Sequence, residues 1–462
     1  MIDRMDSLKR LWHKLTPELW LLYVIAAATR LIGIGSPKNT VFDEIYFKAY
    51  ASYYYSHQYY FDIHPPLGKL ILAGWEWLIR ANPATLTNQT TTSSRIIVAI
   101  AGIGIVAVVY GITRRLSQSR LSAGIAGLIV ALDGALIVES RFVLVDSFLI
   151  FFGLAAVYTA LRFRDHPNWG WLIGCGLLMG AAASIKWTGL APDLVAAVIL
   201  YMAAKKHDNK KIQLVSGFIV VVILSLAVYM ASFAIHFSLL DQSGTGDAFM
   251  SEQFQSTLKG NQFYDPSVHL SYFSKFIQLN KEMYEANESL TATHPYSSKW
   301  YSWPVMYRPV YYWQGPTLSN GKQGNIYLIG NPVSWWLGTL AVIASAVLVL
   351  VPKYRKYLGE RLNVFGILLF AYAVCWLPFI FIGRVMFLYH YLFAYIFSIM
   401  MLSILVGTVI PNKYKNVSPR RMAAILLCVL VIAGFAFFAP LVYGWPLSQQ
   451  GISARTWFSS WR

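Results

Sequence analysis

Blocks of about 20 consecutive apolar residues recur along almost the whole chain, and this feature restricts the fold more than any other. A helical run of that length matches the thickness of a bilayer core. Lipid cannot satisfy the backbone groups of an open strand edge, so helices are the expected spanning structure. Charged residues are only 13% of the chain, against about 25% in a typical soluble protein. The sequence therefore predicts an all-α polytopic membrane protein.

The predicted architecture is one transmembrane domain, residues 1–462, with about eleven helices and two large external loops at 36–92 and 234–331. The spans are expected near 17–35, 93–112, 121–138, 143–161, 169–184, 187–204, 212–233, 332–351, 362–382, 386–410 and 421–443. The segment 66–80 is short and carries charges, so it is expected to be an interfacial helix. Residues 263–288 have the pattern of amphipathic helices, and the aromatic stretch 294–313 fits an interfacial belt or a platform for substrate.

The net charge of +17 follows the spans rather than forming one patch, which argues against nucleic-acid binding and favours topology signals and contacts with membrane lipids. With a cytoplasmic N-terminus, the short segments on the inner side hold 21 of the 38 Lys and Arg residues. This asymmetry predicts that both large loops and the C-terminus lie outside a cytoplasmic (plasma) membrane. The apolar run at 20–34 is expected to be a retained signal anchor.

Chemistry is concentrated in the segment VFDEIYFKAYASYYYSHQYYFDIHPPLGK at 41–69, directly after the first span. It contains the adjacent carboxylates Asp43 and Glu44, and further along His64 and Lys69. A solvated amphipathic loop is the alternative reading of this segment. Because adjacent residues rarely point the same way on a helix, one carboxylate is expected to face substrate while the other makes a structural contact.

More ionisable residues lie at the ends of the predicted spans, where burial is costly and function is the default hypothesis. We expect them at the external face, where each could also be a snorkelling side chain or a structural ion pair. The candidates for binding donor phosphate or substrate, beside His64 and Lys69, are Arg30, Arg95, Glu139, Arg141, Asp146, Lys186, Arg308, Arg384 and His390.

This set of residues suits a lipid-linked phosphosugar as donor. Fixed positive charge would stabilise the phosphate as it leaves, and no general acid is required. The attacking hydroxyl needs one general base, which Asp43 or Glu44 could supply. The external segments contain no second dense acidic cluster, so we expect no metal and no other cofactor.

The motifs FDEIYF at 42–47 and FDIHPPLGKL at 61–70 resemble the first-loop signature of the protein O-mannosyltransferases, which use polyprenyl- or dolichyl-phosphate mannose. LDGALIVESRFVLVDSFLIFF at 132–152, SIKWTGL at 184–190, WPVMYRPVYYW at 303–313 and RVMFLYHYLFAYIF at 384–397 continue the resemblance in order. It covers most of the chain and implies a multispan fold of the GT-C type with external catalytic loops.

The resemblance also implies roles. Asp43 matches the family's proposed catalytic position, Glu44 its essential neighbour, and Arg30 and Arg95 arginines near the active site. It implies inverting transfer of mannose to Ser or Thr hydroxyls of proteins, without a divalent metal. Eukaryotic members carry a β-trefoil domain in the large loop, and here 234–331 is too short for one, which indicates a prokaryotic type and leaves dimer pairing open.

Two other readings remain. A glycolipid or cell-wall polymer could replace the protein acceptor, with the same fold and donor. A lipid-linked sugar transporter is the alternative from another class, but it would need pseudo-symmetric halves and polar residues at the midplane. The charges here collect toward one face instead.

Overall fold

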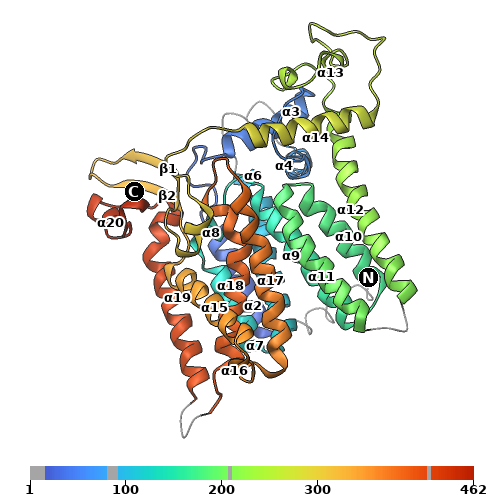
Figure 1. The fold of residues 1–462 in the computed structure, drawn as a ribbon. Coiled ribbons are helices and arrows are strands. Elements are labelled where there is room, and N and C mark those ends of the chain that lie inside the picture. Colours follow the sequence, from blue (N-terminus) through green and yellow to red (C-terminus); the bar gives the residue numbers. More distant parts are fainter. Residues whose placement is uncertain (1–15, 81–91, 207–210, 414–417) are drawn as a thin grey trace, which may run out of the picture.

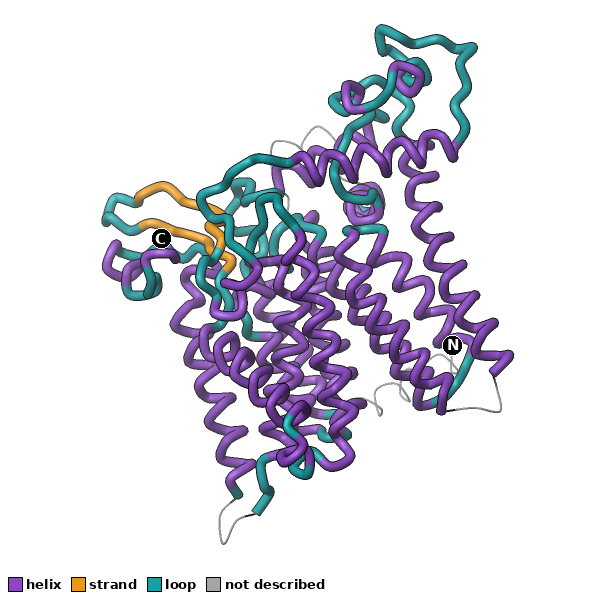
Figure 2. Tube along the Cα trace, viewed as in Figure 1, coloured by secondary structure: helices purple, strands orange, loops and turns teal. Residues whose placement is uncertain are grey.

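The structure, a computed structural model, describes residues 16–80, 92–206, 211–413 and 418–462. Most of these residues are helical, and the long helices lie side by side in one bundle (Figure 1). Loops, a strand pair and crosswise helices gather at one end of it (Figure 2). Outside the described residues lie most of the predicted N-terminal basic segment 1–16, residues 81–91 of the first predicted loop, and parts of the predicted inner segments 205–211 and 411–421.

A helix occupies each of the eleven predicted spans. The helices are α2 (Pro17–Leu31), α6 (Thr92–Ser117), α7 (Arg120–Ala131), α9 (Asp146–Asp165), α10 (Trp169–Ala183), α11 (Leu190–Lys206), α12 (Lys211–Leu239), α15 (Pro332–Leu350), α17 (Leu362–Trp376), α18 (Leu392–Ile404) and α19 (Pro419–Tyr443). Among the described residues, eight helical segments are long and apolar enough to span a membrane. The other three, α2, α7 and α10, have 15, 12 and 15 residues. The protein is therefore a polytopic helical membrane protein, and the count of eleven crossings stays a prediction.

The single span predicted at 121–138 is wrong, because the helix breaks at Asp133. There α7 ends and a short helix, α8 (Gly134–Glu139), begins. The Asp133 carboxylate caps α8 by accepting a hydrogen bond from the Leu136 N–H at 3.1 Å. It also accepts from the Asn331 N–H and the Tyr395 hydroxyl, each at 2.8 Å. A buried carboxylate needs several donors, and the break supplies one of them.

Helix α18 is the centre of the bundle. All of its 13 residues are buried, and it packs against α7, α15 and α17. The peripheral helices α12, α15 and α19 keep apolar side chains such as Ile223, Leu340 and Ile425 exposed. In a membrane those side chains face hydrocarbon, so a bundle with a dry centre and an apolar outside is stable there.

The remaining elements lie at or near the bundle ends. They are α3 (Glu44–Ser56), α4 (Leu67–Leu78), α13 (Glu252–Gln255), α14 (Tyr272–Ser289), β1 (Val310–Thr317), β2 (Gln323–Leu328), α16 (Pro352–Arg355) and α20 (Gln449–Ser453). Figure 1 shows all of these except α16 at the same end, with α14 running across the ends of the long helices. The first loop, the large loop and the C-terminal segment therefore share one end of the bundle, which we call the active-site end. The helices predicted in 66–80 and in 263–288 are present as α4 and α14.

The large loop differs from its prediction in two ways. Helix α12 continues to Leu239, so the chain leaves the bundle later than residue 234. The aromatic stretch also enters an antiparallel hairpin of β1 and β2, a small exception to the all-α prediction. Asn320 and Gly321 lie in its turn, with Gly321 at φ +72°, and an Asn-Gly turn between β-prone residues favours such a hairpin.

Candidate active site

Glu44 is held by a buried network at the start of α3. Arg95, in the first turn of α6, donates to both of its oxygens, from Nε to Oε1 at 2.9 Å and from Nη2 to Oε2 at 2.8 Å. Neither side chain is exposed. The Val143 and Val41 N–H groups donate to the same two oxygens at 2.7 and 2.9 Å. With four donors on one carboxylate, Glu44 fixes the loop before α3 and is not a free base.

Asp43, one residue earlier, is in a different environment. Its carboxylate is half-buried at the N-cap of α3, and it forms no hydrogen bond or ion pair with the described residues. Burial raises the pKa of Asp43 to about 6, Lys186 opposes that rise, and Asp146 and Asp62 add to it. A carboxylate with a raised pKa and no internal partner is available to accept a proton.

The residue before Asp43 has an unusual backbone. Phe42 adopts φ +50°, a left-handed conformation that is rare for an aromatic residue. Its ring stacks on Tyr312 from β1, with centroids 4.1 Å apart. The Tyr312 hydroxyl in turn donates to Glu139 Oε1 at 2.6 Å. The strained turn that presents Asp43 is thus held by the large loop as well as by Glu44.

Two lysines of the site form ion pairs. Lys186, between α10 and α11, donates to Asp146 at 2.7 Å, at the first residue of α9. Lys69 in α4 is buried, and it donates to the carboxylate of Asp62 and to the carbonyl of His64. Each cation therefore has an acidic partner, and Lys186 also lies 5.5 Å from the centre of the Tyr389 ring.

Two adjoining cavities of about 400 and 510 Å³ share a polar wall made of His64, Lys186, Arg384 and His390. Burial lowers the pKa of His64 well below its usual value, with Lys186 adding to the effect, so its imidazole is neutral. The first cavity continues between α9, α11, α17 and α18 along an apolar lining. That lining includes Leu149, Leu190, Leu194, Val374, Pro378 and Phe393. We call the two cavities together the donor cavity, because a cationic head and an apolar tail suit an anionic lipid.

Several predicted residues lie elsewhere. Arg30 donates to the carbonyls of Val130 and Ala131, and Arg141 to carbonyls at the end of α2, so neither lines the donor cavity. Arg95 also bonds to backbone carbonyls of the first loop. Arg308 is bound to the carbonyl of Pro295. The structure brings together His64, Asp146, Lys186, Arg384 and His390 around the donor cavity.

Glu139 is buried beside this group, and its Oε2 has no hydrogen-bond partner among the described residues. Sequence reasoning missed Asp62, the partner of Lys69, although it lies in the FDIHPPLGK motif. It also missed Tyr389, for which an apolar aromatic run offers no signal. In the part of the chain that the structure describes, no three His, Cys, Asp or Glu side chains are grouped as a metal site would require.

Comparisons with known proteins show the family of the chain. The family model described as dolichyl-phosphate-mannose-protein mannosyltransferase matches residues 20–241, and that of the C-terminal four-transmembrane region of protein O-mannosyltransferase matches 272–461. The polyprenol-phosphate-mannose–protein mannosyltransferase of Mycolicibacterium smegmatis is 27% identical, over 96% of this chain and 92% of that protein.

Solved structures share the fold. The S. cerevisiae protein O-mannosyltransferase Pmt1-Pmt2 complex, bound to the sugar donor, superposes with a TM-score of 0.87 at 20% identity, over 96% of this chain and 92% of that one. ArnT from Cupriavidus metallidurans gives 0.52 at 13%, over 92% and 76%. The matched segments together span nearly the whole chain, so this protein belongs to the protein O-mannosyltransferase family and is a glycosyltransferase.

Proposed function

We propose that this enzyme transfers mannose from polyprenyl-phosphate mannose to Ser or Thr hydroxyls of proteins, with inversion at the sugar carbon. Asp43 is the general base. The observation that carries the proposal is the contrast between two adjacent carboxylates, because Glu44 is saturated by donors while Asp43 has none and feels the charge of Lys186. The family membership supports the donor and the protein acceptor.

The donor cavity can hold both the prenyl chain and the phosphate of the donor. The prenyl chain lies along the apolar lining between α9, α11, α17 and α18. The phosphate lies against Lys186 and Arg384, whose positive charge offsets the charge that grows on the leaving oxygen. Asp146 keeps Lys186 in position. Neutral His64 adds hydrogen-bonding capacity without adding a further strong charge, and the His390 side chain lines the same wall.

The acceptor hydroxyl meets the sugar from the side of Asp43. As its oxygen attacks the anomeric carbon, the bond to phosphate breaks and Asp43 takes the hydroxyl proton. A base with a pKa of about 6 is still ionised at pH 7, and it is more basic than an ordinary aspartate. One displacement from the opposite face inverts the configuration, and neither a metal nor another cofactor takes part.

The same proposal includes the orientation of the chain in the membrane. The positive-inside pattern places the N-terminus in the cytoplasm and the active-site end outside the plasma membrane. There the enzyme meets secreted and membrane proteins as acceptors. A prokaryotic type of chain without a β-trefoil domain would recognise them through its own loops.

The test is an assay with purified protein, labelled polyprenyl-phosphate mannose and a Ser/Thr-rich peptide. Asp43→Asn keeps the shape but cannot accept a proton, so it should lose about two or more orders of magnitude in rate. Asp265→Asn is the matched control, because Asp265 is exposed in the large loop and away from the cavity. A chelator in the buffer should leave the transfer rates of the wild-type protein and of the Asp265 variant unchanged.

The outcomes separate the readings. Transfer by wild type and by the Asp265 variant, with loss in the Asp43 variant, supports the proposal. Donor consumption without a labelled peptide would redirect the acceptor to a glycolipid or a cell-wall polymer. A folded wild-type protein that neither binds nor consumes the donor would overturn it.

A further inference from the structure

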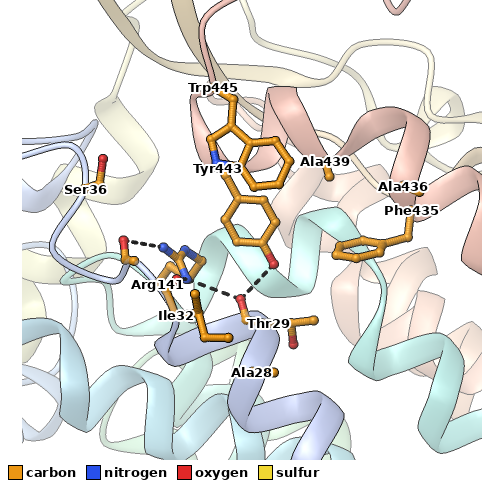
Figure 3. A pocket seen from close by; sticks show the side chains of 11 residues that line it. Ala28, Thr29, Ile32, Ser36, Arg141, Phe435, Ala436, Ala439, Tyr443 and Trp445 are labelled. Carbon is orange, nitrogen blue, oxygen red and sulfur yellow. Dashed lines mark hydrogen bonds between the residues drawn. The ribbon is translucent and has the colours of Figure 1, made fainter.

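A second cavity, of about 490 Å³, opens between α2 and α19 at the active-site end. It shares no lining residue with the donor cavity. In Figure 3 the Tyr443 ring lies between Arg141 on one side and Phe435 on the other, with Trp445 above it. Its lining residues are Ala28, Thr29, Ile32, Gly33, Ser36, Arg141, Phe435, Ala436, Ala439, Tyr443 and Trp445.

Arg141 brings a buried positive charge to this cavity. Its Nη1 donates to the carbonyls of Arg30 and Ile32, each at 2.9 Å, and its Nη2 to that of Gly33 at 2.8 Å. These carbonyls cap the end of α2, and they fix the guanidinium and offset part of its charge. Within the described part of the chain, no carboxylate lies at ion-pair distance from it. A buried cation without a counter-ion is costly, and a bound anion would lower that cost.

The other polar side chains of the cavity can also donate hydrogen bonds. Among the described residues, no acceptor binds the Arg141 Nε–H, the Ser36 hydroxyl or the Trp445 indole N–H. The Tyr443 hydroxyl donates to the Thr29 carbonyl at 2.9 Å, and its ring lies 4.7 Å from the Arg141 guanidinium carbon. No lining residue is acidic. A cavity that presents donors and one guanidinium selects an anion.

The rest of the lining is apolar and comes from the end of α2 and from α19, a helix long and apolar enough to span a membrane. Ile32 is 71% exposed, and Ala28, Phe435, Ala436 and Ala439 form the remaining wall. Tyr443 and Trp445 stack with ring centroids 5.2 Å apart, an aromatic pair of the kind found at headgroup level. The cavity thus has a cationic end beside an aromatic pair and an apolar side along α2 and α19.

We propose that this cavity binds the phosphate ester of a membrane lipid, with the headgroup on Arg141, Ser36 and Trp445 and a chain along α2 and α19. An anionic phospholipid fits, because its net charge neutralises the guanidinium. The segment 140–145 links this site to the active site, since Arg141 contacts the cavity and the Val143 N–H holds Glu44 at 2.7 Å. Binding at this site does not depend on the proposed transfer reaction.

Native mass spectrometry of delipidated full-length protein tests the proposal. Dioleoylphosphatidylglycerol should bind at least tenfold more tightly than dioleoylphosphatidylcholine. Ala436→Trp, which fills the cavity, should weaken phosphatidylglycerol binding at least tenfold. Ala433→Trp is the matched control, because Ala433 is exposed on the same helix and does not line the cavity. Size-exclusion profiles and melting midpoints show that both variants are folded.

Further variants identify the source of the phosphate. Arg141→Met should abolish the preference for phosphatidylglycerol, and Arg141→Lys should keep part of it. Polyprenyl phosphate is tested in the same way in the Lys186→Met background, where the donor cavity is impaired. If wild type binds polyprenyl phosphate but not phosphatidylglycerol, and Ala436→Trp loses that binding, the site is assigned to the prenyl lipid. Equal binding by Ala436→Trp and Ala433→Trp, or no preference for an anionic lipid in wild type, would overturn the proposal.

Discussion

Glu44 and Arg95, 51 residues apart in the chain, form a two-point ion pair from which solvent is excluded. The pair joins the start of α3 to the start of α6. Asp43 lies one residue away without any such partner, so two neighbouring carboxylates have different tasks. Glu44 fixes the position of the loop, and Asp43 has no internal partner, as the proposed role of general base requires.

Glu44→Gln should destabilise the protein strongly. The amide replaces an acceptor with a donor that faces Arg95 and a backbone N–H, and breaking a buried pair costs about 3–5 kcal/mol. Thermal unfolding in detergent should show a clearly lower midpoint. Glu285→Gln is the control, since Glu285 is exposed in an i,i+4 pair with Lys281 and should change little. An unchanged midpoint in the Glu44 variant would remove the structural role argued for it.

Asp43→Asn should have the opposite effect on stability. The folded pKa of about 6 lies above the ordinary 3.8, so the stability linked to this group is present at low pH and is lost as pH rises through 6. The difference corresponds to roughly 3 kcal/mol as an upper limit, and partial solvent exposure reduces it. The variant should therefore melt higher than wild type at pH 8 and similarly at pH 4. A lower midpoint at pH 8 would contradict the raised pKa.

The pH dependence of the reaction should follow Asp43. Below about pH 6 the base is protonated, and kcat/KM should fall tenfold for each further pH unit. Above that pH the rate should reach a plateau. Initial rates between pH 4.5 and 8 measure this profile, and Asp43→Asn should give a low, flat one. The same inflection in the variant would assign it to another group.

Lys186→Met should reduce kcat/KM for the lipid donor by about 100-fold, the usual effect of removing one group that stabilises developing charge. Lys186→Arg should retain more activity than the Met variant. Because Met also leaves Asp146 unpaired, the double variant Asp146→Asn/Lys186→Met separates the two effects. Lys259→Met, in an exposed pair with Asp241, is the control. Full activity of Lys186→Met would exclude a phosphate contact by this residue.

The pair of Lys69 and Asp62 can be tested by a double-mutant cycle. Asp62→Asn leaves a buried ammonium without its counter-ion and should lower the melting midpoint strongly. Lys69→Met combined with Asp62→Asn removes both charges and should recover most of that loss. The measurement is thermal unfolding of all four proteins. Additive losses in the double variant would mean that the two charges do not depend on each other.

The fold was predictable from the sequence in the segments where the lipid environment restricts the backbone to helices. Apolar blocks have to become helices in a bilayer, and a helix lies at each predicted span. The break at Asp133 was not predictable, because its donors Asn331 and Tyr395 come from residues 198 and 262 positions away. The hairpin was missed because the aromatic residues that form it are equally typical of a membrane interface.

The site was predictable in its residue types but not in its division of roles. Asp43 and Glu44 differ only through tertiary partners, which local sequence does not contain. Arg30 and Arg141 have the charge that a phosphate site needs, yet Arg30 donates to carbonyls at the end of α7 and Arg141 to carbonyls at the end of α2. Lys186, Arg384 and His390 converge on one cavity because the α10–α11 and α17–α18 connections, far apart in the chain, meet there.

The buried pair of Glu44 and Arg95 also orders events during biogenesis. Each of the two side chains is hydrated in the nascent chain, and each can leave water only in the company of the other. The segment that carries Asp43 therefore acquires its shape in the step in which α3 docks beside α6, early in synthesis. A chain that fails this step keeps an unpaired arginine at the start of α6.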